Sequence, residues 1–270
     1  MSLTGPRIFL FSYTRDIERV CAAAMRSCYS SLPAFSLFRA KHSRDETEET
    51  LTQDRVKELI RKALKAGHLS VLEHGLLTFD LQGVSRALTH QLVRHRIASF
   101  SQQSQRHVRI DAESDWYVIP PNLGDESKRR FEERMRAVAS WYLEESKSGT
   151  RIEDARFYLP NAAKTNIVVS MNPRELLHVF KMRCGAEAQW EIRAVAWAMM
   201  ACSKIIAPNI FSEPQHLHAD TYFAKREETL EDILSHVRTR FENASAGETV
   251  EIPLTKLELG FDVRAFVYKP

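Results

Sequence analysis

The feature that most constrains this chain is the stretch 81–110, which contains no carboxylate. It holds five arginines and three histidines, but no Asp, Glu or Lys. A basic surface face usually mixes Lys with Arg and includes acids, so that simpler interpretation fits this stretch poorly. Planar guanidinium groups are suited to bidentate contacts with phosphates or carboxylates. The stretch therefore predicts a site for anionic ligands.

The core of this stretch, residues 94–106, reads RHRIASFSQQSQR. Its serine hydroxyls are hydrogen-bond donors of the kind that complete a phosphate site. The apolar residues Leu88 and Leu92 predict a helix over 84–94. The basic motif should then lie at the end of that helix and in the following turn, where backbone donors and side chains can converge.

The remaining sequence predicts a mixed fold. Helical periodicity or composition indicates helices over 16–27, 54–66, 127–147, 187–206 and 228–241. Extended segments are expected at 8–13, 76–81, 165–171, 249–254 and 263–268. Gly67 should end one helix as a C-cap residue, Gly83 should interrupt the chain before the helix at 84, and residues 35–49 should form a surface loop. Asn172 should begin another helix as its N-cap, with Pro173 at N1 and Glu175 reaching back.

These elements predict a single α+β domain with a central, mostly antiparallel sheet flanked by helices. We expect this domain to span residues 1–214 and a C-terminal extension of unassigned role to span residues 215–270.

Composition narrows the classes of protein. The formal net charge of +3 is too small to indicate a nucleic-acid binder, and locally concentrated arginine suits small anions better. The four cysteines are dispersed and form no CxxC pair, which favours a reducing cytoplasm over a secreted disulfide scaffold. No apolar run has membrane-spanning length and no signal-peptide core is present, so we expect a cytoplasmic protein without a membrane partner. The histidines lack the spacing of metal ligands, so no metal is expected.

The motif R-H-R, followed by serines at Ser99 and Ser104 and by Arg106, resembles the signature of the flavin-dependent thymidylate synthases. Further blocks at the family's spacing agree with the resemblance. They are Gly67-His68-Leu69-Ser70-Val71-Leu72-Glu73-His74, Arg156-Phe157-Tyr158-Leu159-Pro160, the residues Asn172, His178 and Arg183, and Gln189-Trp190-Glu191-Ile192. We can place no family counterpart for the 215–270 extension.

The resemblance implies that the protein makes dTMP from dUMP. Methylenetetrahydrofolate would be the carbon donor, and FAD reduced by NADPH would carry the hydride. It also implies a homotetramer with active sites shared between subunits, and no nucleic-acid partner. The residues implied for dUMP are Gln91, Ser104, Arg106, Arg156 and Arg183, with Ser104 and Arg106 at the phosphate. The residues implied around FAD are His68, Ser70, Glu73, Arg94, His95, Arg96, Asn172 and His178.

Arg183 is the expected catalytic residue. Methylation at C5 needs electron density from the uracil ring, so negative charge develops on the carbonyl oxygens, where a guanidinium can stabilise it. The alternative for Arg183 is a helix-surface ion pair with Glu187. Cys184 is adjacent, but we expect it to be a buried structural residue and not a nucleophile.

Two departures from the family pattern leave alternatives open. Ser101-Gln102 stands where many members have Asn-Glu, although other members carry Ser-Gln there. His107 stands where most members have tyrosine, and this change can alter the nucleotide preference. A related enzyme that alkylates C5 of another pyrimidine nucleotide, such as UMP, is therefore the first alternative. An RNA-binding module is an alternative from a different class, but it leaves the blocks at Arg156 and Arg183 unexplained.

Overall fold

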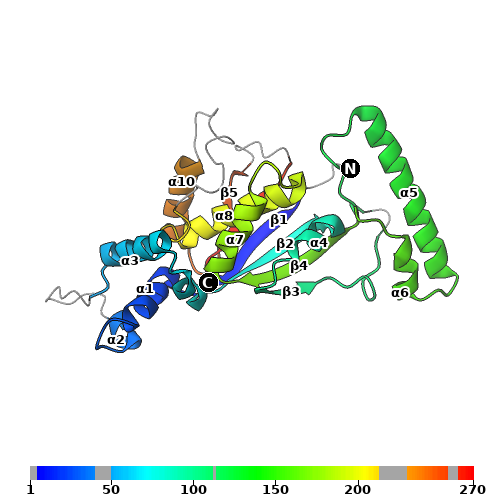
Figure 1. Cartoon of the computed structure of the whole chain (residues 1–270). Helices are drawn as coiled ribbons and strands as arrows, with labels where there is room; N and C mark the ends of the chain where they lie inside the picture. The colour runs from blue at the N-terminus through cyan, green and yellow to red at the C-terminus, as the bar shows by residue number, and fades with distance from the viewer. Residues whose placement is uncertain (1–4, 40–49, 112–113, 213–229, 255–260) are drawn as a thin grey trace.

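One six-stranded sheet lies at the centre of the protein (Figure 1). The structure, a computed structural model, describes residues 5–39, 50–111, 114–212, 230–254 and 261–270. The strand order is β3-β4-β2-β1-β6-β5, and all neighbouring pairs are antiparallel except β1 with β6. The strands are β1 (Arg7–Tyr13), β2 (Leu77–Ser85), β3 (Ala98–Gln102), β4 (Lys164–Met171), β5 (Thr249–Ile252) and β6 (Arg264–Tyr268). The predicted α+β fold with a mostly antiparallel sheet is confirmed.

Helices flank this sheet and extend beyond both of its ends (Figure 1). Those in the described ranges are α1 (Ile17–Ser27), α2 (Ala34–Arg39), α3 (Gln53–Ala66), α4 (Arg86–Leu92), α5 (Asp125–Lys147), α6 (Ile152–Ala155), α7 (Pro173–Arg183), α8 (Trp190–Ile206) and α10 (Leu230–Asn243). Two short 3₁₀ helices, η1 (Leu69–His74) and η2 (Arg156–Tyr158), complete the described elements. None of the helices in these ranges is long and apolar enough to cross a membrane.

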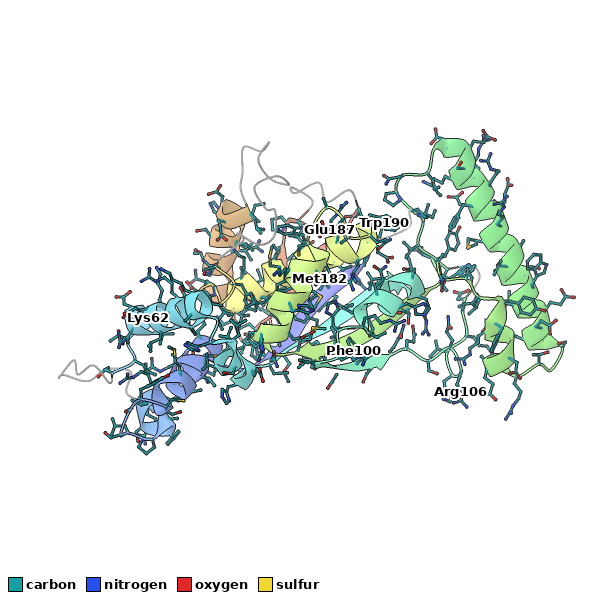
Figure 2. All side chains as sticks on the ribbon, in the orientation of Figure 1. Lys62, Phe100, Arg106, Met182, Glu187 and Trp190 are labelled. Carbon is teal, nitrogen blue, oxygen red and sulfur yellow. The ribbon has the colours of Figure 1, made fainter. Side chains whose placement is uncertain are left out.

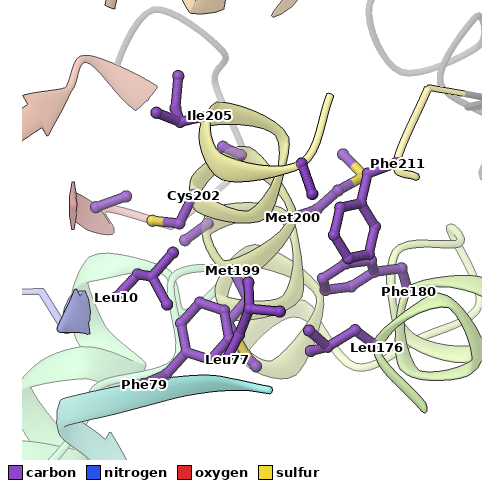
Figure 3. Close-up of a cluster of buried hydrophobic side chains, with 14 of the residues drawn as sticks. Leu10, Leu77, Phe79, Leu176, Phe180, Met199, Met200, Cys202, Ile205 and Phe211 are labelled. Carbon is purple, nitrogen blue, oxygen red and sulfur yellow. The ribbon is translucent and has the colours of Figure 1, made fainter. Parts of the chain in front are cut away.

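The main core lies between one face of the sheet and helix α8. Side chains alternate along the strands, so Leu77, Phe79 and Leu81 of β2 are fully buried while their neighbours are partly exposed. Helix α8 is apolar on nearly all sides, and Figure 3 shows its Met199 and Met200 packed among side chains from the sheet and α7. Alternating burial of this kind is typical of an antiparallel sheet with one covered face.

Helix α5 forms an arm at the end of the sheet opposite to α1–α3 (Figure 1). It has a small core of its own, in which Met135 and Ala139 pack against Trp116 and Ala163. This core connects the arm to the segment that enters β4. The arm thereby holds α6 and η2 near the C-terminal end of β3.

The described residues of the predicted C-terminal extension complete the central sheet. Strand β6 pairs in parallel with β1, from Arg7 opposite Arg264 to Leu10 opposite Val267. Helix α10 buries Ile233 and Leu234 in the same core as β1 and β2. The predicted boundary at residue 214 lies outside the described residues and stays a prediction.

Several predicted elements differ from the structure around the basic motif. Strand β2 continues through Gly83, whose φ of 71° accompanies a register shift between Leu81 and Val84. Helix α4 is consequently shorter than the predicted helix over 84–94. The turn after α4 leads into β3, a strand that the sequence did not predict.

The predicted loop over 35–49 was wrong for its first residues, because 35–39 belong to helix α2 and Leu37 is fully buried. Residues 40–49 of that loop, like residues 228 and 229 of the last predicted helix, lie outside the described residues.

Candidate active site

Sheet register brings the Arg-His-Arg motif next to helix α7. Ala98 at the start of β3 lies opposite Met171 at the end of β4. Helix α7 begins directly after β4, because the side-chain oxygen of Asn172 accepts a hydrogen bond from the Glu175 amide at 2.9 Å and Pro173 occupies the first turn. The turn 94–97 therefore lies beside the first residues of α7.

His95 is the residue at which this site converges. Its side chain is only 5% exposed, and Arg183 Nε donates a hydrogen bond to His95 Nε2 at 3.1 Å. On its other side, His95 Nδ1 lies 3.4 Å from Glu175 Oε1. The ring of His178 packs edge-on against it, with 5.6 Å between ring centroids. We call these four residues the His95 cluster.

The environment of His95 keeps its imidazole neutral near pH 7. Burial, and then the charges of Arg183 and His178, lower the pKa of His95 from 6.5 to about 4. Burial also raises the pKa of the Glu175 carboxyl. A neutral imidazole carries one proton, and because Nε2 accepts from Arg183, that proton lies on Nδ1 and faces Glu175.

This depressed pKa predicts a loss of stability in acid. The stabilising contribution of neutral His95 is present above pH 6.5 and is lost as the pH falls toward 4, because the unfolded chain then binds a proton that the folded chain excludes. As the pH falls from 6.5 to 4, the free energy of unfolding should therefore decrease by roughly 3 kcal/mol more in wild type than in His95→Asn, because asparagine does not titrate. Urea unfolding at several pH values measures this difference. Parallel curves for the two proteins would contradict the neutral, buried state of His95. The raised pKa of Glu175 acts in the opposite direction, but both proteins keep that residue.

A cavity of about 600 Å³ lies next to the His95 cluster. Its walls are mostly apolar, and its polar residues are Arg174, Glu175, His178 and Lys181. The apolar lining residues are Leu64, Leu69, Ile97, Leu177, Phe180 and Ile210. They come from the end of α3, η1, the basic turn, α7 and the segment after α8, so the cavity joins three of the sequence blocks.

The residues of η1 reach α7 through an ion pair between Glu73 and Arg174. His68 precedes η1 as its N-cap residue, and Ser70 lies within it. Both side chains are exposed, as are Arg94 and Arg96 in the basic turn. The structure thus brings η1, the basic turn and α7 around one cavity, and of the residues that the resemblance implies for FAD, His178 lines it.

A second cluster lies where the chain leaves β3. Arg106 donates from Nε and Nη2 to Glu153 Oε2 at 2.9 and 2.8 Å, and Arg151 lies 3.1 Å from the other oxygen. Arg156 donates to the backbone oxygen of Glu153 at 3.1 Å. Hydrogen bonds from Arg106, with its charge and that of Arg151, lower the pKa of the Glu153 carboxyl. We call Arg106, Arg151, Glu153 and Arg156 the Glu153 cluster.

Ser104 and Arg86 adjoin the Glu153 cluster. The hydroxyl of Ser104 accepts from the Arg106 amide at 3.2 Å, and Arg86 donates to the backbone oxygen of Gln103 at 2.9 Å. Burial, and then the charge of Arg156, lower the pKa of Arg86. The guanidinium groups of Arg86 and Arg156 repel each other, and an anion bound between them would relieve that repulsion. Arg86 is therefore a candidate anion-binding residue that the sequence analysis did not identify.

The two clusters are separate within one chain. Figure 2 shows Arg106 beside α6, well apart from Met182, which precedes Arg183 on α7. In the described ranges, no hydrogen bond or ion pair joins the two groups. Within the described residues, the side chain of Gln91, expected with the nucleotide residues, makes only a long 3.4 Å hydrogen bond to the backbone oxygen of Ala87 in its own helix.

The contacts of Arg183 and Cys184 bear on the two alternatives for these residues. Arg183 bonds to His95, and no ion pair with Glu187 appears in the described part of the chain. Cys184 is 1% exposed and burial raises its pKa well above the usual value, which agrees with the structural interpretation. Glu175 does not reach back as a capping-box residue, because its carboxylate faces His95 instead.

The sequence also missed a buried contact that anchors α4. Glu191, at the start of α8, accepts from the backbone N–H of Ser85 at 2.7 Å and from its hydroxyl, while that hydroxyl caps α4 by accepting from the Leu88 amide at 3.0 Å. The only available sequence signal was the position of Glu191 in the Gln189–Ile192 block.

The fold and these clusters define an α+β protein with an arginine-rich site for anionic ligands. Its residues 9–209 match the family described as thymidylate synthase complementing protein, and the chain belongs to that family.

Among similar proteins, the flavin-dependent thymidylate synthase of Geobacter sulfurreducens is 46% identical over 209 residues, which cover 77% of this chain and 86% of that protein. The flavin-dependent thymidylate synthase of Saccharolobus solfataricus is 38% identical over 236 residues, covering 86% of this chain and 87% of that protein. This second match covers more of the chain than residues 1–214 contain. At least part of the 215–270 segment therefore has a counterpart in a relative.

Proposed function

We propose that this protein catalyses the reductive methylation of dUMP to dTMP, with methylenetetrahydrofolate as carbon donor and FAD, reduced by NADPH, as hydride carrier. The observation that carries the proposal is the contact between Arg183 and a neutral, buried His95 beside a cavity of about 600 Å³. A guanidinium oriented in this way can stabilise negative charge that develops on a pyrimidine ring. Membership of the family and the names of the relatives support the same reaction.

The cavity fits a flavin by its chemistry. Apolar side chains such as Leu69, Ile97 and Leu177 suit a flat aromatic ring, and Arg174 and Lys181 add positive charge that suits a pyrophosphate. When bound, the flavin provides the hydride, and the protein binds and orients it. We assign His68, Ser70, Glu73, Arg94, His95, Arg96, Asn172 and His178 to this part of the site. Asn172 uses its side-chain oxygen as a helix cap, so its amide N–H groups remain to donate to a ligand.

The nucleotide site would use Gln91, Ser104, Arg106, Arg156 and Arg183. Ser104 and Arg106 lie together at the end of β3, and the guanidinium of Arg106 already binds a carboxylate, that of Glu153. A phosphate carries more charge and offers two oxygens for a bidentate contact, so it would replace Glu153 at Arg106. Arg86 adds a further cation close to Arg156.

We further propose that the active form is a cytoplasmic homotetramer with shared active sites. Arg183 and the phosphate-binding residues are separated in one chain, as Figure 2 shows for Met182 and Arg106. A second subunit can bring its own Glu153 cluster to the His95 cluster of the first. The free thiols of Cys21, Cys28, Cys184 and Cys202 agree with a reducing compartment.

An assay of product formation tests the proposed reaction. Purified protein is incubated with FAD, NADPH, methylenetetrahydrofolate and either dUMP or UMP, and the nucleotides are separated by chromatography. We expect dTMP from dUMP, and no product when FAD or the folate is omitted. A methylated product from UMP alone would support the alternative substrate, and no nucleotide product under any condition would refute the proposal.

A further inference from the structure

We propose that Glu175 is a positioning residue for the reaction: it fixes the tautomer of His95, and His95 in turn fixes the orientation of the Arg183 guanidinium. The inference rests on the proposed function, because it assumes that Arg183 contacts the nucleotide. Glu175 belongs to none of the residues implied by the family resemblance.

The first step is the contact between Glu175 and His95. Both side chains are nearly excluded from solvent, with relative exposures of 6% and 5%, and their Oε1 and Nδ1 atoms are 3.4 Å apart. At this distance a carboxyl oxygen attracts an N–H group on Nδ1 and repels a lone pair there. It therefore favours the His95 tautomer that carries its proton on Nδ1.

The second step is the contact between His95 and Arg183. With the proton on Nδ1, the Nε2 atom has a free lone pair that accepts from Arg183 Nε at 3.1 Å. The other neutral tautomer would bring an N–H group against the N–H of Arg183, and two donors at that distance repel each other. Protonation of His95 would have the same effect, and its pKa of about 4 prevents this near neutral pH.

The third step concerns the rest of the guanidinium. Only Nε of Arg183 is used by His95, and in the described part of the chain Nη1 and Nη2 have no hydrogen-bond or ion-pair partner. A guanidinium is planar, so a fixed Nε–H fixes the plane and direction of both outer nitrogens. We call this series of contacts from Glu175 through His95 to Arg183 the relay. It leaves two pre-oriented N–H donors for the ligand, so less entropy is lost in orienting the guanidinium during the reaction.

The simpler interpretation is that Glu175 only stabilises the start of α7. The helix cap, however, uses the backbone N–H of Glu175 and the side chain of Asn172, so it survives substitution of the Glu175 side chain. Variants at this position can therefore remove the contact with His95 while keeping the cap.

The test compares Glu175→Gln with Glu175→Met. Both side chains resemble Glu in length, but only the Gln oxygen is a good acceptor for the His95 proton. Leu176→Val, a conservative change at the adjacent buried position, is the matched control for effects on the packing of α7. We expect kcat to fall roughly 10- to 100-fold in Glu175→Met, and to change less than about threefold in Glu175→Gln and Leu176→Val.

A second readout is independent of turnover. In ¹⁵N-histidine NMR spectra of the flavin-free protein, His95 is assigned by its loss in His95→Asn. We expect Nδ1 to be protonated and Nε2 unprotonated in wild type and Glu175→Gln, and both tautomers to be populated in Glu175→Met. A purely structural role for Glu175 would leave the tautomer unchanged.

The outcomes are separable from those for the proposed function. Wild-type kcat in Glu175→Met, equal losses in Glu175→Met and Glu175→Gln, or wild-type His95 protonated on Nε2 would each overturn the relay. The last measurement needs no variant of Glu175, so it decides even if Glu175→Met does not fold. A wild-type protein with the expected tautomer but without dTMP synthesis would instead refute the proposed reaction.

Discussion

Arg183→Ala is expected to lose turnover, by on the order of 100- to 1,000-fold in kcat or more, while the protein still binds flavin. The variant removes the guanidinium that would stabilise charge on the uracil carbonyl oxygens. It leaves the cavity beside α7 in place, because Arg183 does not line it. Steady-state assays of dTMP formation and the flavin absorbance of the same preparation measure the two properties together.

Arg183→Lys separates charge from geometry. A lysine ammonium keeps the positive charge, but it cannot offer one N–H to His95 and two coplanar N–H groups to the ligand. We therefore expect Arg183→Lys to be impaired nearly as much as Arg183→Ala. Arg130→Ala removes an exposed arginine of α5 that, among the described residues, pairs only with Glu126 and Ser127, and this control should keep full activity. Full activity in Arg183→Ala would remove Arg183 from the mechanism.

Glu191→Ala is expected to lower the free energy of unfolding by roughly 3 kcal/mol or more. It would leave the backbone N–H and the hydroxyl of Ser85 without their acceptor in a region where Ser85 is 2% and Glu191 1% exposed. It would also loosen the start of α4, which leads to the basic turn. Urea or thermal unfolding measures the change in stability.

Glu191→Gln is the matched variant, because its amide oxygen can still accept from Ser85. Burial raises the pKa of the Glu191 carboxyl. The associated stability is therefore present below the carboxyl's ordinary value of 4.5 and is lost as the pH rises through the higher folded value. The free energy of unfolding of wild type should accordingly fall relative to Glu191→Gln as the pH rises from 4.5 toward neutral. Equal free energies of unfolding for wild type, Glu191→Ala and Glu191→Gln would contradict the anchoring role of Glu191.

Local patterns were sufficient to predict much of this fold. Apolar periodicity located α3 and α5, and the Asn172-Pro173 pair located the start of α7, because these signals depend on neighbours within one or two turns. The basic turn and α7 were both identified as parts of the site from the motif blocks. That His95 is the point where they meet was not predicted.

Long-range pairing explains what could not be predicted. Strand β3 is a five-residue edge strand in which only Ala98 and Phe100 are apolar, so its alternation is too short to predict a strand. Its partner β4 is more than 60 residues away. The parallel pairing of β6 with β1 joins the two ends of the chain. The roles of Glu175 and Glu191 depend on His95 and Ser85, which are equally remote in sequence. Nothing local to Glu175 distinguishes it from a surface acid, and for Glu191 the only local signal was its position in the Gln189–Ile192 block.

The visible absorption spectrum of the purified protein, with dUMP or UMP added stepwise, tests the central claim most directly. We expect a flavin band that changes with dUMP and not with UMP, because the nucleotide should bind against the flavin. A protein that remains colourless after incubation with FAD would contradict a flavin-dependent thymidylate synthase function.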